Sequence, residues 1–487
     1  MIFENNNQRH SLTALLLSVS VLFASCSGAG GSGADTSAPD STKADTTVAE
    51  SVDIYASLPE GDFDGYNFRM LQYEETTAVT AFCDAKELNG EVINDDIYNR
   101  SRNVEQKLNV KISHTLETLA NVNTIMSNAI IAGEDVYDTF WQHSTTTTQN
   151  FLSKGYLLDM SDISTLDFTE PWWNTTATED ISLGNKIFYA FGDINIQLYD
   201  FQSVISFNKD IVKSYSLDNP YDLVNGGTWT MDRFIEMGSE VSGDTNGNGI
   251  VDAGDMSGFG GYATATMFGF MHGADVSLFT KDKDSMPSYN GISAKFESVY
   301  DRYCAFFSNK TYSHVNDNYT EIFSAGNMLF MSQGVGQLSL LRDIEPDYGI
   351  IPFPKYDEAQ EGYISFITNQ IQPTVLPVTN TDPERAGAIL ANLSAESYRL
   401  VRDDYFALLL NQKYVRDETS IEMLDLIYNS PARFELEHIY DWAAAQRIIA
   451  SGFMTPGVNI VTSIAAIESK MLAAMENTLD YLGLTTN

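Results

Sequence analysis

Residues 91–112 of this 487-residue chain are EVINDDIYNRSRNVEQKLNVKI, a stretch that joins an amphipathic helix to a strand. The spacing of its apolar residues predicts a helix over residues 94–108, with one face formed by Ile97, Val104 and Leu108. Residues 110–112 (Val-Lys-Ile) are typical of a strand, as are residues 67–71 (Asn-Phe-Arg-Met-Leu) on the N-terminal side. A strand, a helix and a strand in this order favour layered α/β architecture.

The same alternation continues along the chain. It predicts a helix over residues 122–132, a strand over residues 135–141 and a short helix over residues 148–154. In open α/β sheets, ligands bind beyond the carboxyl ends of the strands. Trp141, Gln142 and His143 lie at the end of the third predicted strand, so we expect a ligand near them.

Length, composition and charge narrow the possible functions. The length favours two or more lobes, and 43% hydrophobic residues supply packed interiors, which excludes a wholly disordered chain. The 28 basic and 66 acidic residues give a net charge of −38. Such a charge repels phosphate backbones and disfavours nucleic-acid binding, whereas it suits a neutral or cationic ligand.

The N-terminal segment is typical of an export signal. An apolar run over residues 12–23 is followed by Ala24-Ser25-Cys26, which resembles the cleavage site of bacterial lipoproteins, with Phe23 where that family usually has Leu. The resemblance implies a signal peptide over residues 1–25, a lipid on Cys26 and a solvated tether over residues 26–54; ordinary secretion is the alternative. The folded part would then lie outside the cell, bound to the membrane through the lipid alone.

Seven further segments follow the order found in one family. They are EVINDDIYNRSRNVEQKLNVKI, DVYDTFWQHS…LSKGYLLDMSD, KIFYAFGDINIQLYDFQSVISFNKDI, GTWTMDRFIEMGSEV, FSAGNMLFMSQGVGQL, DYGIIPFPK and TDPERAGAILANLSAES. In this order they resemble the extracellular solute-binding proteins of ABC importers, in the carbohydrate-binding branch (family 1, similar to maltose-binding protein). No single segment is diagnostic, but together they cover nearly the whole chain after the tether.

The resemblance implies a two-lobed, type II periplasmic-binding-protein-like α/β fold whose hinge is crossed about three times. The crossings would lie near residues 200–203, 361–365 and 400–404. The first lobe would comprise residues 55–201 and 364–401, and the second lobe residues 202–363 and 402–487.

Sugar recognition requires aromatic faces against pyranose rings, with polar groups around them for the hydroxyls. The resemblance favours Trp141 and Trp442 as such platforms. Trp172 and Trp173 are weighed evenly between ligand contact and packing, and Trp229 is expected to pack in the interior. The polar candidates are Gln142, Asp200 and Gln337; Asp200 could equally cap the hinge, and the glycines beside Gln337 would also suit a plain tight loop.

Residues 244–255, DTNGNGIVDAGD, resemble an EF-hand or dockerin-type calcium loop. The predicted ligands alternate along the loop, with Ile250 acting through its carbonyl group: Asp244, Asn246, Asn248, Ile250, Asp252 and Asp255. Asp255 stands where EF-hands prefer Glu. We expect a structural Ca²⁺; a solvated turn built on Asx and Gly residues is the alternative.

No sequence motif indicates catalysis. The chain has no HExxH, GxSxG or CxxC motif, and a glycosidase-like carboxylate pair cannot be singled out among 66 acids. We therefore expect a monomeric, non-enzymatic importer component that binds a sugar or oligosaccharide and delivers it to a permease. The alternatives are a surface receptor or adhesin of the same fold, and a binder of a non-sugar solute.

Overall fold

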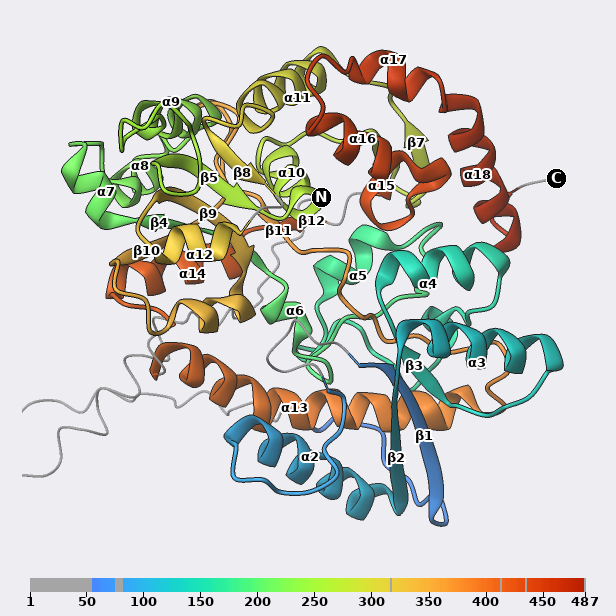
Figure 1. Ribbon diagram of the computed structural model, residues 1–487. Coiled ribbons are helices and arrows are strands. Elements are labelled where there is room, and N and C mark those ends of the chain that lie inside the picture. The colour runs from blue at the N-terminus through green and yellow to red at the C-terminus, as the bar shows by residue number, and fades with distance from the viewer. Residues whose placement is uncertain (1–54, 75–81, 316–317, 412–413, 434–435, 486–487) are drawn as a thin grey trace, which may run out of the picture.

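The computed structural model describes residues 55–74, 82–315, 318–411, 414–433 and 436–485. The predicted signal peptide, Cys26 and the tether lie outside these described residues. Two β-sheets, each flanked by helices, occupy the lower and upper parts of the molecule (Figure 1). The predicted α/β class is confirmed.

The first lobe is built on a parallel sheet in the order β2-β1-β3, formed by β1 (Tyr66–Tyr73), β2 (Val110–Glu117) and β3 (Thr139–Trp141). Helix α2 (Val92–Leu108) joins β1 to β2, and α3 (Leu119–Ala132) joins β2 to β3. Strand β3 is shorter than the predicted 135–141, and just before it the Asp138 carboxylate accepts hydrogen bonds from the backbone and guanidinium of Arg69. Asp138 thus holds the chain beside β1 through its side chain before β3 begins.

The second lobe contains a five-stranded sheet in the order β10-β4-β9-β5-β8. The strands are β4 (Ser203–Asn208), β5 (Ser257–Gly261), β8 (Ser313–Val315), β9 (Met328–Gly334) and β10 (Tyr348–Ile351). Strand β4 runs antiparallel to β9, with Ser203 opposite Gly334, whereas β5 is parallel to both β8 and β9. The start of β4 therefore lies at the same sheet edge as the ends of β5, β8 and β9.

Helices flank this second sheet and fill the rest of the upper lobe (Figure 1). They are α7 (Lys209–Ser214), α8 (Pro220–Asn225), α9 (Met231–Val241), α10 (Ala263–Gly273), α11 (Ala294–Phe307), α12 (Tyr319–Ser324) and α14 (Glu418–Asn429). The smaller elements are α5 (Thr175–Ile181), α6 (Gln197–Asp200), β6 (Phe279–Lys281), β7 (Pro287–Tyr289), η2 (Met160–Asp162), η3 (Val335–Leu341) and η4 (Trp442–Ala444).

Two of the predicted crossings lie side by side. The Gln202 side chain donates a hydrogen bond to the carbonyl of Phe366, which belongs to β11 (Ser365–Phe366), and β11 pairs with β12 (Ala432–Arg433). Helix α13 (Pro383–Asn411) packs against α2 and runs unbroken through residues 400–404. A third crossing at that point would be carried by a rigid helix, and the lobe boundaries themselves stay a prediction.

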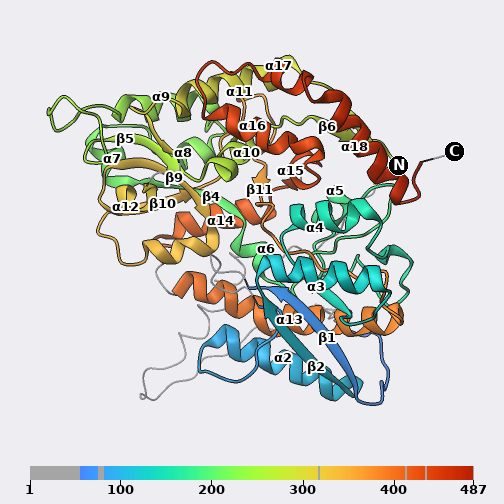
Figure 2. The same cartoon turned by 45° about the vertical axis from the view of Figure 1, so that its right-hand side comes forward.

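The C-terminal helices contact both lobes, although the sequence placed residues 402–487 in the second lobe alone. They are α15 (Leu436–Ile439), α16 (Ala445–Phe453), α17 (Ile460–Ala465) and α18 (Glu468–Tyr481). Helix α16 packs against α10 and α11, whereas α15 contacts α4 (Ser144–Asn150) and α18 contacts η1 (Leu152–Lys154) of the first lobe. The turned view in Figure 2 shows this arrangement along one side of the molecule.

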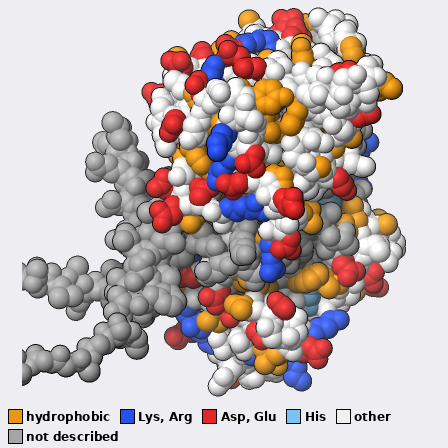
Figure 3. Space-filling view, turned by 60° about the vertical axis from the view of Figure 1, so that its left-hand side comes forward, with side chains coloured by type: hydrophobic (Ala, Val, Ile, Leu, Met, Phe, Trp, Pro, Cys, Tyr) orange, Lys and Arg blue, Asp and Glu red, His pale blue; other side chains and the backbone are white. Residues whose placement is uncertain are grey.

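The surface carries mixed charge. On the face shown in Figure 3, acidic and basic side chains are scattered among one another over both parts of the molecule. Within the part of the chain that the structure describes, no helix is both long and apolar enough to span a bilayer.

Candidate ligand-binding cleft

A hollow of about 340 Å³ opens at the edge of the second-lobe sheet. Its walls come from the places where strands begin or end: Ser203 at the start of β4, Tyr262 after β5, and Ser332 to Gly334 at the end of β9. The volume falls within the usual range of small-molecule sites, about 300–1,000 Å³. The hollow lies where open α/β sheets bind ligands.

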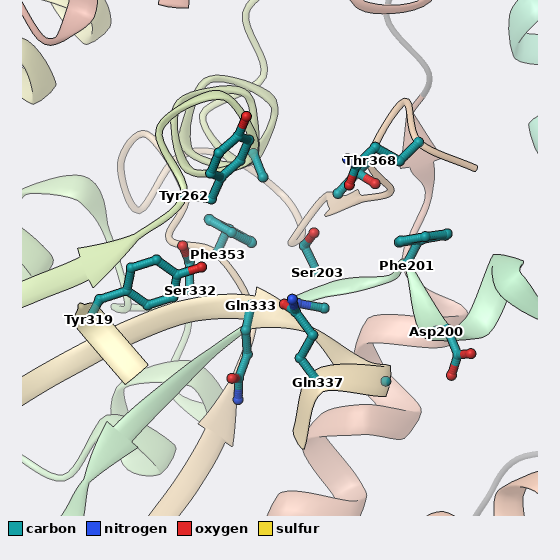
Figure 4. Close-up of a pocket in the computed structure, with 14 residues that line it drawn as sticks. Asp200, Phe201, Ser203, Tyr262, Tyr319, Ser332, Gln333, Gln337, Phe353 and Thr368 are labelled. Atoms are coloured by element: carbon teal, nitrogen blue, oxygen red, sulfur yellow. The ribbon is translucent and has the colours of Figure 1, made fainter. Parts of the chain in front are cut away.

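Four aromatic residues surround this hollow: Phe201, Tyr262, Tyr319 and Phe353 (Figure 4). Tyr262 is 55% exposed, although it is a large ring next to a buried strand. Tyr319 packs closely over β5, since a Cβ atom at Gly260 would lie 2.6 Å from the Cβ of Tyr319. Burial, with a smaller contribution from Tyr262, raises the pKa of Tyr319, so its hydroxyl stays protonated and able to donate.

Hydroxyl and amide groups complete the lining. Ser332 Oγ is 2.8 Å from Thr266 Oγ1, and Gln337 Oε1 accepts from the Gly334 backbone at 3.1 Å. Because the carbonyl oxygen of Gln337 is used in this way, its amide nitrogen remains to donate to a ligand. Thr368 is 9% exposed, and its Oγ1 has no hydrogen-bond partner among the described residues. An unpaired buried hydroxyl costs free energy that a ligand can recover by hydrogen bonding.

Asp200 also borders the hollow, but its carboxylate points away from the centre (Figure 4). The Tyr405 hydroxyl donates to Asp200 Oδ1 at 2.7 Å. A Cβ atom at Gly336 would lie 2.9 Å from the same oxygen, so this glycine lets the loop pass close to Asp200. The carboxylate is therefore bonded to Tyr405 and does not point into the hollow; whether Asp200 caps the hinge, the alternative from the sequence, stays a prediction.

A second hollow of about 250 Å³ adjoins the first. The two share Tyr262, Ala265, Thr368 and Gln370, and so form one continuous cleft. The second hollow draws on both lobes and on the C-terminal helices, with a lining that includes His143, Thr145, Thr146, Thr264, Asn369, His438, Gln446 and Arg447. Residues from separated parts of the chain therefore meet around it.

His438 holds the crossing segment at this second hollow. Its Nε2 accepts from the Asn369 backbone at 3.1 Å, and its Nδ1 lies 3.3 Å from the Gln446 amide nitrogen. Burial lowers the pKa of His438 to about 3, so the ring is neutral at physiological pH. It contributes shape and hydrogen bonding to the cleft but no charge.

The four tryptophans proposed as ligand residues lie in packed interiors instead. Trp141 is fully buried and donates from Nε1 to Thr374 Oγ1, and Trp442 donates to Thr478 Oγ1 and stacks on Tyr440. Trp172 and Trp173 are buried in the first-lobe core. None of the four borders either hollow. The returning chain at residues 374–375 covers the sheet edge at Trp141, whereas Trp442 packs against Phe279 and Tyr440. Trp229 is buried, as predicted, and donates to the Pro352 carbonyl.

Of the polar candidates, Gln337 lies in the cleft and Gln142 does not. Gln142 is fully buried at the end of β3, and neither of its amide atoms has a partner among the described residues. Sequence reasoning missed Tyr262, Tyr319 and Thr368. The first two could have been found by applying the carboxyl-end rule to the second-lobe strands, since they follow β5 and β8.

The predicted calcium loop, residues 244–255, folds around its own acidic side chains. Asp255 Oδ1 accepts from the backbone of Thr245 and Asn246 at 2.9 and 3.0 Å, and the Asp244 carboxylate accepts from Gly247 and Gly249. The hydrogen bond from Asn246 is the main reason that the pKa of Asp255 lies below its usual value. The oxygen donors suit Ca²⁺ in kind, although within the described residues no three acidic or imidazole side chains are gathered as a metal site.

Solved structures of other proteins share this fold. A substrate-binding protein from Listeria monocytogenes in complex with cycloalternan superposes with a TM-score of 0.51 at 11% identity, covering 87% of this chain and 100% of that one. A maltose/maltodextrin-binding domain from Bdellovibrio bacteriovorus bound to maltotriose gives 0.52 at 10%, covering 85% and 99%. A family 1 extracellular solute-binding protein from Bifidobacterium longum gives 0.54 at 14%, covering 84% and 100%. The predicted two-lobed fold is confirmed.

Among curated protein sequences none matches this chain. The family model described as bacterial extracellular solute-binding protein matches residues 106–399, which is more than half of the chain and includes the second-lobe strands that border the cleft. Fold, cleft and sequence therefore agree: the chain belongs to the family of bacterial extracellular solute-binding proteins.

Proposed function

We propose that the protein captures a sugar or oligosaccharide in the interlobe cleft and delivers it to the permease of an ABC importer. The observation that carries this proposal is the lining of the first hollow. Aromatic faces and uncharged hydroxyl and amide groups surround a space into which no charged side chain points in Figure 4. Aromatic rings suit the apolar faces of pyranoses, and the surrounding groups suit their hydroxyls.

The shape of the cleft favours capture by closure. The second hollow takes Thr145 and Thr146 from the first lobe and Thr264 from the second, so a ligand there would contact both. A ligand favours a closed state only if it binds that state more tightly. Contacts from both lobes supply this difference, because they exist together only when the lobes are close.

The structural neighbours support a sugar as ligand. Among them are proteins bound to cycloalternan, to maltotriose and to α-D-tagatose, the last from Thermotoga lettingae with a TM-score of 0.53 at 15% identity. Their ligands differ in size and in ring type. They support the class of ligand for this chain and not one sugar.

We also propose that the protein is not an enzyme. Hydrolysis of a glycosidic bond commonly uses two carboxyl groups on either side of it. Asp200 is the acidic residue of the described lining of the first hollow, and its carboxylate is turned toward Tyr405. This arrangement supports binding without turnover.

The proposal includes the sequence-based expectations for the membrane and the metal. Lipid on Cys26 would hold a monomer at the outer face of the membrane, and Ca²⁺ in the 244–255 loop would stiffen the approach to β5. A mass spectrum of the membrane-extracted protein tests the lipid.

Melting curves after chelation, then with Ca²⁺ or Mg²⁺ restored, test whether the 244–255 loop binds metal. Asp244→Ala should remove any response to Ca²⁺.

The function is tested by calorimetry of the intact protein against neutral mono- and oligosaccharides, with amino acids and short peptides as the comparison panel. A sugar present at a free concentration 100 times its dissociation constant should raise the free energy of unfolding by about 2.7 kcal/mol. Small-angle scattering on the same samples should show a more compact molecule. Binding by peptides but by no sugar would contradict the proposal, and so would release of sugar products.

A further inference from the structure

The second hollow carries a positive charge that the first lacks. Arg447 borders it, on the first turn of α16, which begins at Ala445. The Arg447 side chain is exposed, and among the described residues its guanidinium has no hydrogen bond or ion pair within 4 Å, only a longer-range attraction to Asp441. Other arginines of this acidic chain are paired: Arg69 with Asp135 and Asp138, and Arg399 with Glu396.

The position of Arg447 in the first turn of α16 is unfavourable for a positive charge. The N-terminal end of a helix carries a partial positive charge, so a cation in the first turn is unfavourable by about 0.3–1 kcal/mol. Burial raises the pKa of the Asp441 carboxyl group to about 6, although the hydrogen bond that it accepts from the Gln446 backbone at 2.9 Å and the nearby Arg447 charge both lower this pKa. Asp441 is buried and does not line the hollow, so the charge that faces the cleft is that of Arg447.

The remaining lining of this hollow does not neutralise Arg447. It consists of threonine hydroxyls, the amides of Asn369, Gln370 and Gln446, alanines, Tyr262, His143 and His438, and it contains no acidic residue. The net charge of −38 repels anions at long range. Screening limits that effect to about 8 Å at physiological ionic strength, so the local arginine decides what binds here.

Resting on the function proposed above, we infer that the natural ligand is an acidic saccharide. Its neutral rings occupy the first hollow, and a negative group on one end, a carboxylate or a sulfate ester, pairs with Arg447 in the second. A guanidinium group can give two parallel hydrogen bonds to two oxygens of a planar carboxylate or of a tetrahedral sulfate ester. Tyr262, which borders both hollows, would lie beneath the sugar that joins the two ends.

Calorimetry with matched ligand pairs tests this inference. One arm compares xylo-oligosaccharides that end in glucuronic acid with unsubstituted xylo-oligosaccharides, and oligogalacturonides with their methyl esters. The other compares sulfated galacto-oligosaccharides with unsulfated ones. In at least one pair the acidic member should bind about ten- to a hundredfold more tightly, as expected for a hydrogen bond to a charged group. The arm in which the acidic member binds more tightly shows whether the negative group is a carboxylate or a sulfate ester.

Variants then assign the preference to one side chain. Arg447→Gln should reduce the acidic-over-neutral ratio toward one, and Arg447→Lys should keep part of it. Arg399→Gln, on the outer surface of α13, should leave the ratio unchanged. Equal or tighter binding of the neutral members, or a ratio that Arg447→Gln leaves intact, overturns the inference while the sugar-binding function stands. No binding by any saccharide overturns both.

Discussion

In both lobes the carboxyl ends of parallel strands meet at one sheet edge, where a ligand could bind, but the two edges differ in what covers them. In the first lobe, residues 140–142 at the end of β3 are fully buried, and residues 374–375 of the returning chain hydrogen-bond to this edge. In the second lobe, the ends of β5, β8 and β9 border an open hollow with the exposed ring of Tyr262. Strand direction thus marks where a ligand could bind, and the segments that return over the edge decide whether one can.

The largest effect that tests this comparison is expected at the packed edge. Trp141→Ala removes a fully buried ring and its hydrogen bond to Thr374, and should lower the free energy of unfolding by about 3–5 kcal/mol. Chemical denaturation measures the loss. Calorimetry on the fraction that remains folded should give unchanged sugar affinity, whereas the sequence-based role of Trp141 as a sugar platform requires weaker binding.

A second test concerns a buried acid between the two edges. Burial raises the pKa of Asp193 to about 7, and its carboxyl group accepts from the Tyr199 hydroxyl at 2.7 Å. Because its folded-state pKa exceeds the ordinary value, the group's stabilising contribution is complete below about pH 4 and is lost as the pH rises through 7. Asp193→Asn should remove this dependence, on the order of 1–3 kcal/mol between pH 5 and pH 8.

Urea unfolding of both proteins at several pH values measures that difference. Asp162→Asn, on the exposed η2 segment, provides the matched control and should keep the wild-type profile. Parallel profiles for wild type and Asp193→Asn would show that Asp193 ionises normally in the folded protein.

At the open edge, the expected effect is on binding. Tyr262→Ala removes an exposed ring that borders both hollows and should weaken sugar binding by about 1–3 kcal/mol, with little change in the melting temperature of the ligand-free protein. Tyr481→Ala, which removes a ring 62% exposed on α18, is the control and should leave affinity unchanged. Equal affinity for the two variants would remove Tyr262 from the site.

The smallest effect is expected at Gln142, whose buried amide lacks partners. Replacing it by Met keeps the approximate volume and removes the uncompensated polar group, so stability should rise by about 1 kcal/mol. Denaturation measures the gain. A loss of sugar affinity in the folded variant would instead show that Gln142 reaches ligand when the lobes separate, and that the first-lobe edge opens.

Local sequence patterns predicted many of the helices and strands, because these elements depend mainly on residues close together in the sequence. The spacing of apolar residues in 91–112 gave α2 to within two residues at its start and gave the start of β2, although β2 extends five residues beyond the predicted 110–112. Trp229 lies in the interior as expected. The resemblance to the family, rather than the local pattern, favoured Trp141 and Trp442 as ligand residues, and both are buried. A tryptophan after a strand satisfies a ligand and a packed core equally well in sequence, and what distinguishes them is the distant segment that packs over it.

The sequence by itself determined the α/β framework, the acidic charge and the family. Only the tertiary structure decided that the second-lobe edge is open, that Asp200 turns toward Tyr405, and that His143, Thr264 and Arg447 border one hollow. The reason is physical. Helices and strands follow from contacts within a few residues, whereas a cleft depends on packing between segments far apart in the sequence, such as those that carry His143 and Arg447.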